Sequence, residues 1–272
     1  RFAEASREMI ERGDYVVPYF NNHLRFDKPP LTYWAQIAGY KAFGQNDFAA
    51  RFPSIIAAAL TALSIFVWGS CLPSPLRPSA SDVPAGTARV GWASPIIFTL
   101  SLQTFLHAKA AVADMWLVLF VTLAHWAGYE LLRDRLSPPA DQTSNSPQDE
   151  SVRMADIKPP FALLRRGRHQ TSRWWWVFYL SLALAFLAKG PIGWIPLLTV
   201  GLTVIFLREK ALVRRFAFGG GLPLMLSIVA LWGIPALIQT HGQFFVVGIG
   251  RHVIGRSLAT MEGHGASSFG MY

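Results

Sequence analysis

Long apolar stretches separated by short polar segments are the main pattern of this chain. Several reach the length of roughly 18 residues that lets a helix cross the ~30 Å hydrocarbon core of a membrane. The pattern predicts six spanning helices, at about 52–72, 92–107, 115–132, 174–188, 191–207 and 216–238. The predicted fold class is therefore all-α, a polytopic transmembrane helical protein.

The polar segments divide the chain into five predicted parts. Residues 1–50 form an extracytoplasmic loop with interfacial helices, and 51–132 and 174–238 hold the spanning helices. Residues 133–173 contain PPADQTSNSPQDES, a composition typical of a disordered linker. Residues 239–272 form a second, truncated extracytoplasmic loop. The chain is expected to be a piece of a longer protein with at least one more span before Arg1.

Within the first part, Pro29-Pro30 predict the start of a helix at Leu31–Phe43, because proline is favoured in a first turn. Aromatic side chains such as Tyr33 and Trp34 suit a helix that lies in the membrane interface. Residues 1–18 contain a further short amphipathic helix, for which a purely structural role is the alternative.

Composition agrees with a membrane protein. Hydrophobic residues make up 52% of the chain and charged residues 15%, whereas a soluble domain carries about 25% charged residues. The net charge is +9, but the excess flanks the apolar runs, so we expect no nucleic-acid partner. The single cysteine, Cys71, excludes an intramolecular disulfide and suits a packing role.

The charges of the loops predict the orientation. Loop 133–173 holds eight Lys/Arg against five Asp/Glu, and loop 208–215 holds four against one, so both should be cytoplasmic. The other loops then share the outer face of the inner membrane, the predicted active face. Every ionisable candidate falls there: Arg1, Asp27, Lys28, Lys109, Asp114, Lys189, Arg251, His252, Arg256 and His264.

The segment RFDKPPLTYW, residues 25–34, carries the clearest candidate chemistry. Lys28 lies just before a helix N-terminus, where an anion is favoured, and an ammonium group binds phosphate well. An interfacial lysine that extends toward lipid headgroups is the alternative. The same alternative holds for Lys189 at another span mouth, and a helix N-cap is the alternative for Asp114.

A divalent metal of the zinc type is the candidate cofactor. His252 and His264 together with Asp27 could ligate it, although no HExxH or CxxC spacing is present. The sequence holds no Gly-rich phosphate loop, so we expect no nucleotide.

Six segments together resemble one family, and they occur in that family's order: RFAEASREMIERGDYVVPYF, RFDKPPLTYW, FGQNDFAARFPS, HAKAAVADMW, LAKGPIGWIPLL and HVIGRSLATMEGH. The family is the lipid-linked-sugar glycosyltransferases of the GT-C fold, in the aminoarabinose transferase (ArnT-like) branch related to protein O-mannosyltransferases. The resemblance implies a polyprenyl-phosphate sugar as donor and polyprenyl phosphate as leaving group.

The resemblance also implies residue roles. Arg1 and Lys28 look like the residues that neutralise the donor phosphate. Asp27, where the family usually has Glu, looks like a metal ligand together with His252. Asp114, counted with the catalytic candidates, and Lys189 look like acceptor-side residues; the substrate-binding candidates are Lys189, Tyr33 and Arg256. The family's principal catalytic carboxylate is expected to precede Arg1.

The function predicted from the sequence is transfer of a sugar, such as 4-amino-4-deoxy-L-arabinose, from its polyprenyl-phosphate carrier to lipid A or another envelope acceptor. An enzyme like the protein O-mannosyltransferases, with a polypeptide hydroxyl as acceptor, is the first alternative. A transporter or flippase is the second, but it predicts charges deep within spans, and here they lie at the mouths.

Overall fold

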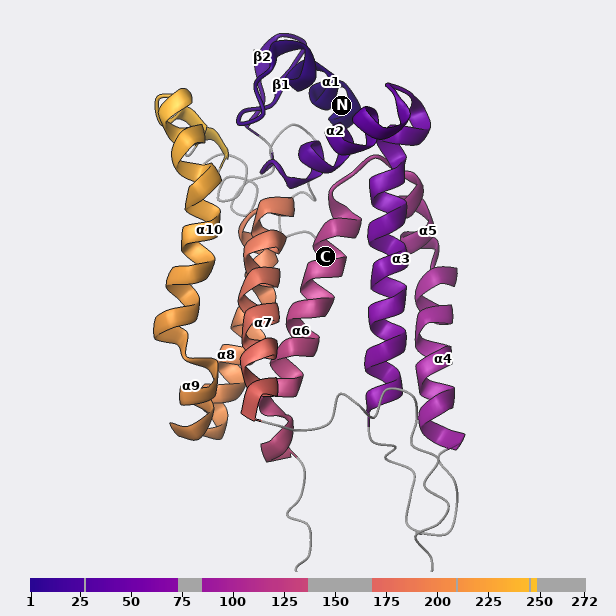
Figure 1. Cartoon of the computed structure of the whole chain (residues 1–272), viewed down its shortest axis with the longest axis vertical. Helices are drawn as coiled ribbons and strands as arrows, with labels where there is room; N and C mark the ends of the chain where they lie inside the picture. The colour runs from indigo at the N-terminus through magenta and orange to yellow at the C-terminus, as the bar shows by residue number, and fades with distance from the viewer. Residues whose placement is uncertain (27, 73–84, 137–167, 209, 245, 249–272) are drawn as a thin grey trace, which may run out of the picture.

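A computed structural model describes residues 1–272 except 27, 73–84, 137–167, 209, 245 and 249–272. Figure 1 shows a helical bundle that is capped at one end by the N-terminal segment. The cap contains α1 (Phe2–Arg12), β1 (Tyr19–Phe20), β2 (His23–Leu24) and α2 (Leu31–Phe43). The bundle contains α3 (Asp47–Cys71), α4 (Ala85–Leu100), α5 (Leu102–Lys109), α6 (Asp114–Leu136), α7 (Arg168–Lys189), the 3-10 helix η3 (Pro191–Trp194), α8 (Ile195–Leu207), α9 (Lys210–Phe216) and α10 (Phe218–Gln239).

Among the described residues, three stretches are long and apolar enough to cross a membrane: Asp47–Cys71, Asp114–Arg133 and Ala211–Gln239. Two shorter apolar helical stretches, Gly91–Leu100 and Pro191–Leu207, accompany them. The all-α prediction is confirmed, and α2 has the predicted bounds. The division into six spans and five parts stays a prediction.

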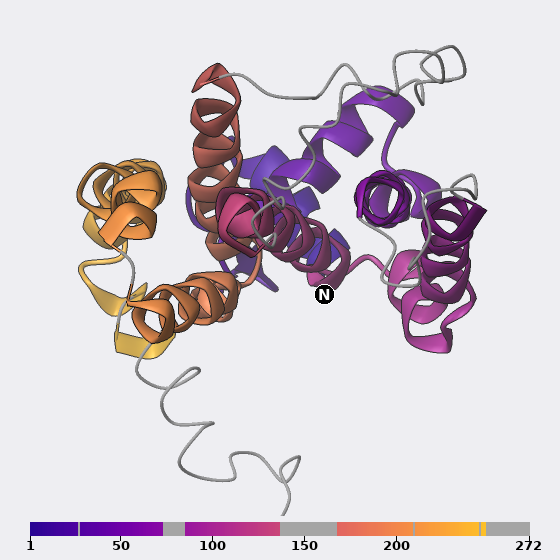
Figure 2. The same cartoon turned by 90° about the horizontal axis from the view of Figure 1, so that it is seen from below.

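Helix α7 lies in the interior of the bundle, although it is not among the three stretches just named. Its C-terminal half is largely buried: Phe178, Tyr179, Leu182, Ala183, Ala185, Phe186, Leu187 and Ala188. It packs against α6, α10 and η3. The end-on view of Figure 2 and the side view of Figure 1 both place α3 and α4 on one side of α6 and α10 on the other. The core therefore forms where α6 and α7 meet.

Helices α1 and α2 pack on each other to form the cap. The Ser6 hydroxyl donates to Gln36 Oε1 at 2.7 Å, and both side chains are buried. The Tyr40 hydroxyl donates to the carbonyl of Ala3 at 3.1 Å, and burial raises the pKa of Tyr40. These contacts fix the start of α1, and hence Arg1, relative to α2.

The connection after α1 attaches the cap to the bundle. The indole of Trp232 in α10 donates to the carbonyl of Val16 at 2.9 Å, and Gln239 donates to Asp14 Oδ2 at 2.6 Å. Val17 is buried with Leu187 at the end of α7 and with Trp232. The cap is thus held against the ends of α7 and α10 by apolar contacts as well as hydrogen bonds.

The close packing of η3 on α7 predicts the effect of Gly193→Ala. A Cβ at Gly193 would lie 2.5 Å from the backbone carbonyl carbon of Ala185, and backbone yields little. We expect the free energy of unfolding in detergent to fall by about 1–3 kcal/mol. Gly201→Ala is the control, because no atom lies within 4 Å of its Cβ position and alanine favours a helix. Equal thermal midpoints of the two variants would contradict this packing.

Candidate active site

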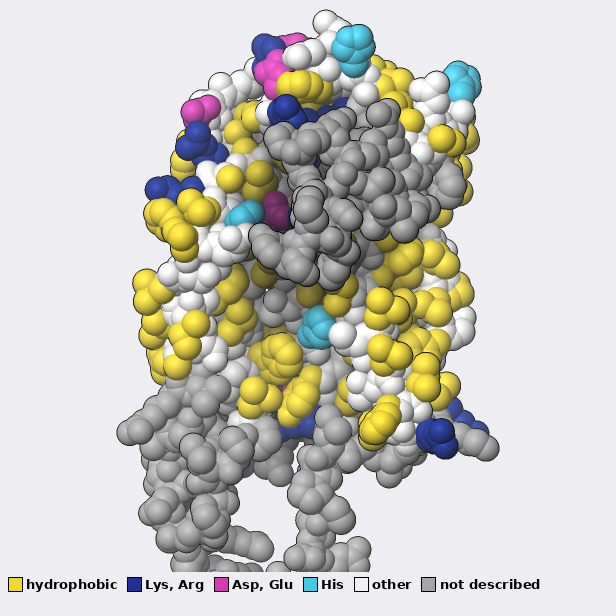
Figure 3. Space-filling view, turned by 180° about the vertical axis from the view of Figure 1, so that it is seen from behind, with side chains coloured by type: hydrophobic (Ala, Val, Ile, Leu, Met, Phe, Trp, Pro, Cys, Tyr) yellow, Lys and Arg dark blue, Asp and Glu magenta, His cyan; other side chains and the backbone are white. Residues whose placement is uncertain are grey.

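The polar candidates of the described chain gather at the capped end. In Figure 1 the cap, the start of α6 and the C-terminal ends of α7 and α10 lie at this end, and α9 lies at the other. Figure 3 shows charged side chains near the cap and hydrophobic ones along the flanks. The described parts of the loops predicted to share one face lie at this end of the bundle. Which side of a membrane they face stays a prediction.

A pocket of about 340 Å³ opens in the cap. Its wall consists of Arg1 and of residues in or next to the β1–β2 hairpin: Phe20, Asn21, His23, Leu24, Arg25 and Phe26. Two guanidinium side chains thus line one pocket, together with an imidazole. A cationic pocket of this kind suits an anionic group such as a phosphate.

Arg25 is fixed by aromatic rings. Its guanidinium carbon lies 4.9 Å from the ring centroid of Phe2 and 5.6 Å from that of Phe20, within cation–π range. Its Nε and Nη1 atoms are buried. Arg25 was not among the site residues predicted from the sequence. The aromatic residues around it were visible in the sequence, but only the fold brings Phe2 to it.

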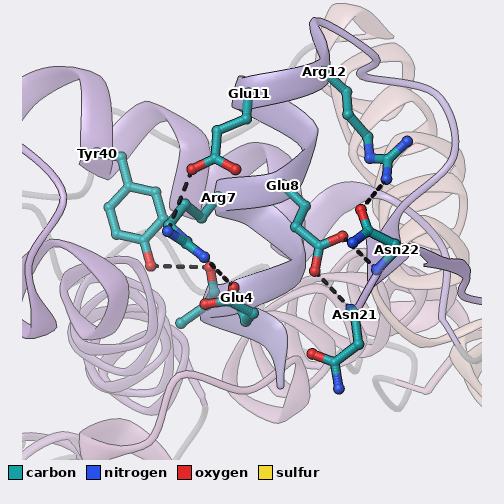
Figure 4. Close-up of polar contacts among 9 residues, drawn as sticks. Glu4, Arg7, Glu8, Glu11, Arg12, Asn21, Asn22 and Tyr40 are labelled. Atoms are coloured by element: carbon teal, nitrogen blue, oxygen red, sulfur yellow. Dashed lines mark hydrogen bonds and ion pairs between the residues drawn. The ribbon is translucent and has the colours of Figure 1, made fainter.

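The hairpin has a two-residue turn in which both residues are left-handed. Asn21 has φ 53° and Asn22 has φ 62°, as a type I′ turn requires. Figure 4 shows that the Glu8 carboxylate in α1 accepts the backbone N–H of both residues, at 2.7 and 3.2 Å. Arg12 donates to Asn22 Oδ1 at 2.5 Å and lies 4.2 Å over the Tyr19 ring. This hairpin was not predicted from the sequence, although the Asn21-Asn22 pair is a signal for such a turn.

Lys28 lies in the connection between the hairpin and α2, whose N-cap is Pro30. The ring of Phe26, two residues earlier, contacts that of Phe244 with 5.9 Å between centroids. A Cβ at Gly248 would lie 2.8 Å from the Phe26 carbonyl oxygen, so the chain after α10 packs tightly here. Lys28, the predicted phosphate ligand, thus lies only two residues along the chain from Phe26, which contacts the segment after α10.

Asp114 and Lys189 form an ion pair, although 75 residues separate them. Asp114 is the first residue of α6 and Lys189 the last of α7. Their side chains are 30% and 27% exposed, so the pair lies at the rim of the bundle. The two residues to which the resemblance gives an acceptor-side role thus contact each other.

The remaining candidates are not brought into this arrangement by the described structure. Tyr33 is completely buried and packs on Phe2, with 5.5 Å between ring centroids, so its ring does not line the pocket. Asp27, His252 and Arg256 lie outside the described residues. Within the described ranges, no three His, Cys, Asp or Glu residues are placed to hold a metal ion. The metal site and the roles of these residues stay predictions.

The chain is similar in sequence to proteins whose names state an activity. No protein-family model matches the chain. An undecaprenyl phosphate-α-4-amino-4-deoxy-L-arabinose arabinosyl transferase of Pseudomonas fluorescens is 26% identical over 89% of the chain, which spans 36% of that relative. The transferase of the same name from Edwardsiella ictaluri is 34% identical over 47% of the chain and 22% of its own length.

Solved structures share the fold. The crystal structure of ArnT from Cupriavidus metallidurans bound to undecaprenyl phosphate matches with a TM-score of 0.70 and 19% identity. The match covers 93% of this chain and 39% of that one. The chain thus spans well under half of the relatives it matches. These findings confirm the predicted resemblance to ArnT and the polytopic GT-C fold class.

Because Asp114 and Lys189 form an ion pair, we expect substitutions of the two residues to have non-additive effects on stability. We expect Asp114→Asn and Lys189→Gln each to lower the free energy of unfolding by about 1–2 kcal/mol, because each leaves a half-buried charge without its partner. The double variant should lose clearly less than the sum. Arg51→Gln is the control, since its ion pair with Asp47 is solvent-exposed. Additive losses in denaturant titrations would contradict a direct pairing.

Proposed function

We propose that this chain is part of an integral membrane glycosyltransferase that moves a sugar from a polyprenyl-phosphate carrier to an acceptor of the cell envelope. Similarity along 89% of the chain to a transferase with such a donor in its name carries the proposal. The match in fold to ArnT and the pocket lined by Arg1 and Arg25 support it independently.

The chemistry requires a cationic site at the donor phosphate. In the transfer, the bond between the sugar's anomeric carbon and a phosphate oxygen breaks, and an acceptor oxygen takes its place on that carbon. Polyprenyl phosphate leaves with additional negative charge. Fixed cations lower the barrier because they stabilise this charge as it develops. Arg1 and Lys28 are the proposed ligands of the phosphate, and Arg25 adds a third cation in the same region of the cap.

The proposed sugar is 4-amino-4-deoxy-L-arabinose or a related one, and the proposed acceptor is lipid A or another envelope glycan. The names of the relatives support the sugar. Transfer to protein is the alternative outcome that the experiment below distinguishes. Asp114 and Lys189 are proposed to lie on the acceptor side, where their ion pair would hold the start of α6 and the end of α7 together.

The proposed orientation places the capped end outside the inner membrane. Arg214 and Arg215 belong to α9, at the opposite end of the bundle. Positively charged segments remain cytoplasmic, so the pocket would face the donor headgroups of the outer leaflet.

Sugar transfer by the full-length protein tests the proposal. The protein would be placed in membranes that lack such an enzyme, polyprenyl-phosphate sugars supplied, and extracted lipid A analysed by mass spectrometry. We expect a sugar-sized mass gain, and a fall in kcat of about 100-fold for Lys28→Ala. Arg7→Ala is the matched control, because its exposed cation pairs with Glu4 and Glu11 on the outer side of α1.

Each alternative has its own result. Donor consumption without modified lipid A, together with glycosylated protein, would favour a polypeptide acceptor. If no donor were consumed with any sugar, the enzyme proposal would be wrong. Equal kcat in wild type and Lys28→Ala would remove the phosphate role of that residue.

A further inference from the structure

The β1–β2 hairpin supplies nearly the whole wall of the pocket in the cap. Except for Arg1, every lining residue belongs to the hairpin or directly follows it. A strand pair of two residues each is too short to hold its own position. The geometry of the pocket therefore depends on what fixes the hairpin from outside.

Glu8 is the main external attachment of the turn. It lies on α1 and is 8% exposed, and its two carboxylate oxygens each accept one backbone N–H of the turn. Hydrogen bonds to a carboxylate are stronger than those between neutral groups. Because the residues are 13 and 14 positions apart, these bonds connect the hairpin to a helix that is itself packed on α2.

A second residue of α1, one helical turn after Glu8, also contacts the Asn21-Asn22 turn of the hairpin. Arg12 donates to the Asn22 side chain (Figure 4). Its guanidinium also lies over the Tyr19 ring, so the hairpin is held at this strand as well. Arg1, the other wall of the pocket, directly precedes α1. One helix therefore determines the relative positions of Arg1 and of the strand that leads into Arg25.

We infer that Glu8 is a positioning residue for donor binding: its carboxylate fixes the hairpin so that Arg1 and Arg25 line the same pocket. The inference rests on the proposed function, in which this pocket takes the donor's phosphate end. Glu8 acts through the turn, at the back of the hairpin, and is not itself among the residues that line the pocket.

Glu8→Gln in the full-length protein tests the inference. The amide keeps one acceptor oxygen, but its NH2 group would face a backbone N–H, donor against donor. We expect the KM for the polyprenyl-phosphate sugar to rise about tenfold while kcat stays within about threefold, because a displaced wall weakens donor binding. Glu11→Gln on the exposed side of α1 is the matched control and should leave both constants unchanged.

A pair of turn variants keeps the test decisive if Glu8→Gln does not fold. Asn22→Val places a β-branched residue at φ 62°, which strains the turn and should raise the donor KM as Glu8→Gln does. Asn22→Gly loses the same Arg12 contact but keeps the left-handed conformation and the backbone N–H that Glu8 binds, so its KM should stay clearly below that of Asn22→Val.

The possible results separate this inference from the proposed function. An active wild type with an unchanged donor KM in both Glu8→Gln and Asn22→Val would overturn the inference alone. A similar KM rise in Glu11→Gln would also overturn it, because general loosening of α1 would then explain the effect. A wild type that transfers no sugar would overturn the proposed function, and the inference with it.

Discussion

A membrane interior offers no water to backbone N–H and C=O groups, so a chain that enters it must satisfy them within helices. The described bundle follows from this constraint, because its long elements are helices with apolar outer faces. Phe206 and Leu231 are 86% and 78% exposed, which is costly in water and suitable in lipid. The Asp114–Lys189 ion pair forms where the ends of two such helices meet.

In the cap, too, backbone polar groups need hydrogen-bond partners. Its helices run partly across the end of the bundle (Figure 1). Indole N–H groups of Trp34 and Trp232 satisfy consecutive carbonyls in the connection after α1, those of Tyr15 and Val16. Tryptophan suits this position because its ring is apolar and its N–H can reach a polar partner. The connection after α1 is thereby joined to α2 within the cap and to α10 in the bundle.

The sequence was sufficient for the features that follow from local pattern. Apolar runs predicted the all-α fold class, and prolines predicted the start of α2 at Leu31; both are confirmed. The six spans and the orientation inferred from loop charge stay predictions. The pairing of Asp114 with Lys189 could not be predicted from spacing, because it depends on how α6 and α7 pack. The interior position of α7 was also hidden, since tryptophan and polar residues at its start lower its apparent hydrophobicity.

The candidate site was predicted only in part for the same reason. Arg1 was selected from its segment, but its partner Arg25 depends on rings from two separate elements, Phe2 and Phe20. No local sequence pattern indicates that these two rings and Arg25 lie together in the fold. Nor does the turn's Asn-Asn signal reveal that a buried glutamate thirteen residues earlier will bind it.

The aromatic surroundings of Arg25 also explain why arginine suits this position better than lysine. A planar guanidinium stacks on rings through its face, so the orientation of the group is set by Phe2 and Phe20. A lysine ammonium is a point charge on a flexible stem and gains no comparable orientation from them. A cation whose orientation is already fixed loses less conformational entropy when it binds an anion. Under the proposed function, the hairpin and the rings around Arg25 would therefore contribute to donor recognition through pre-organisation.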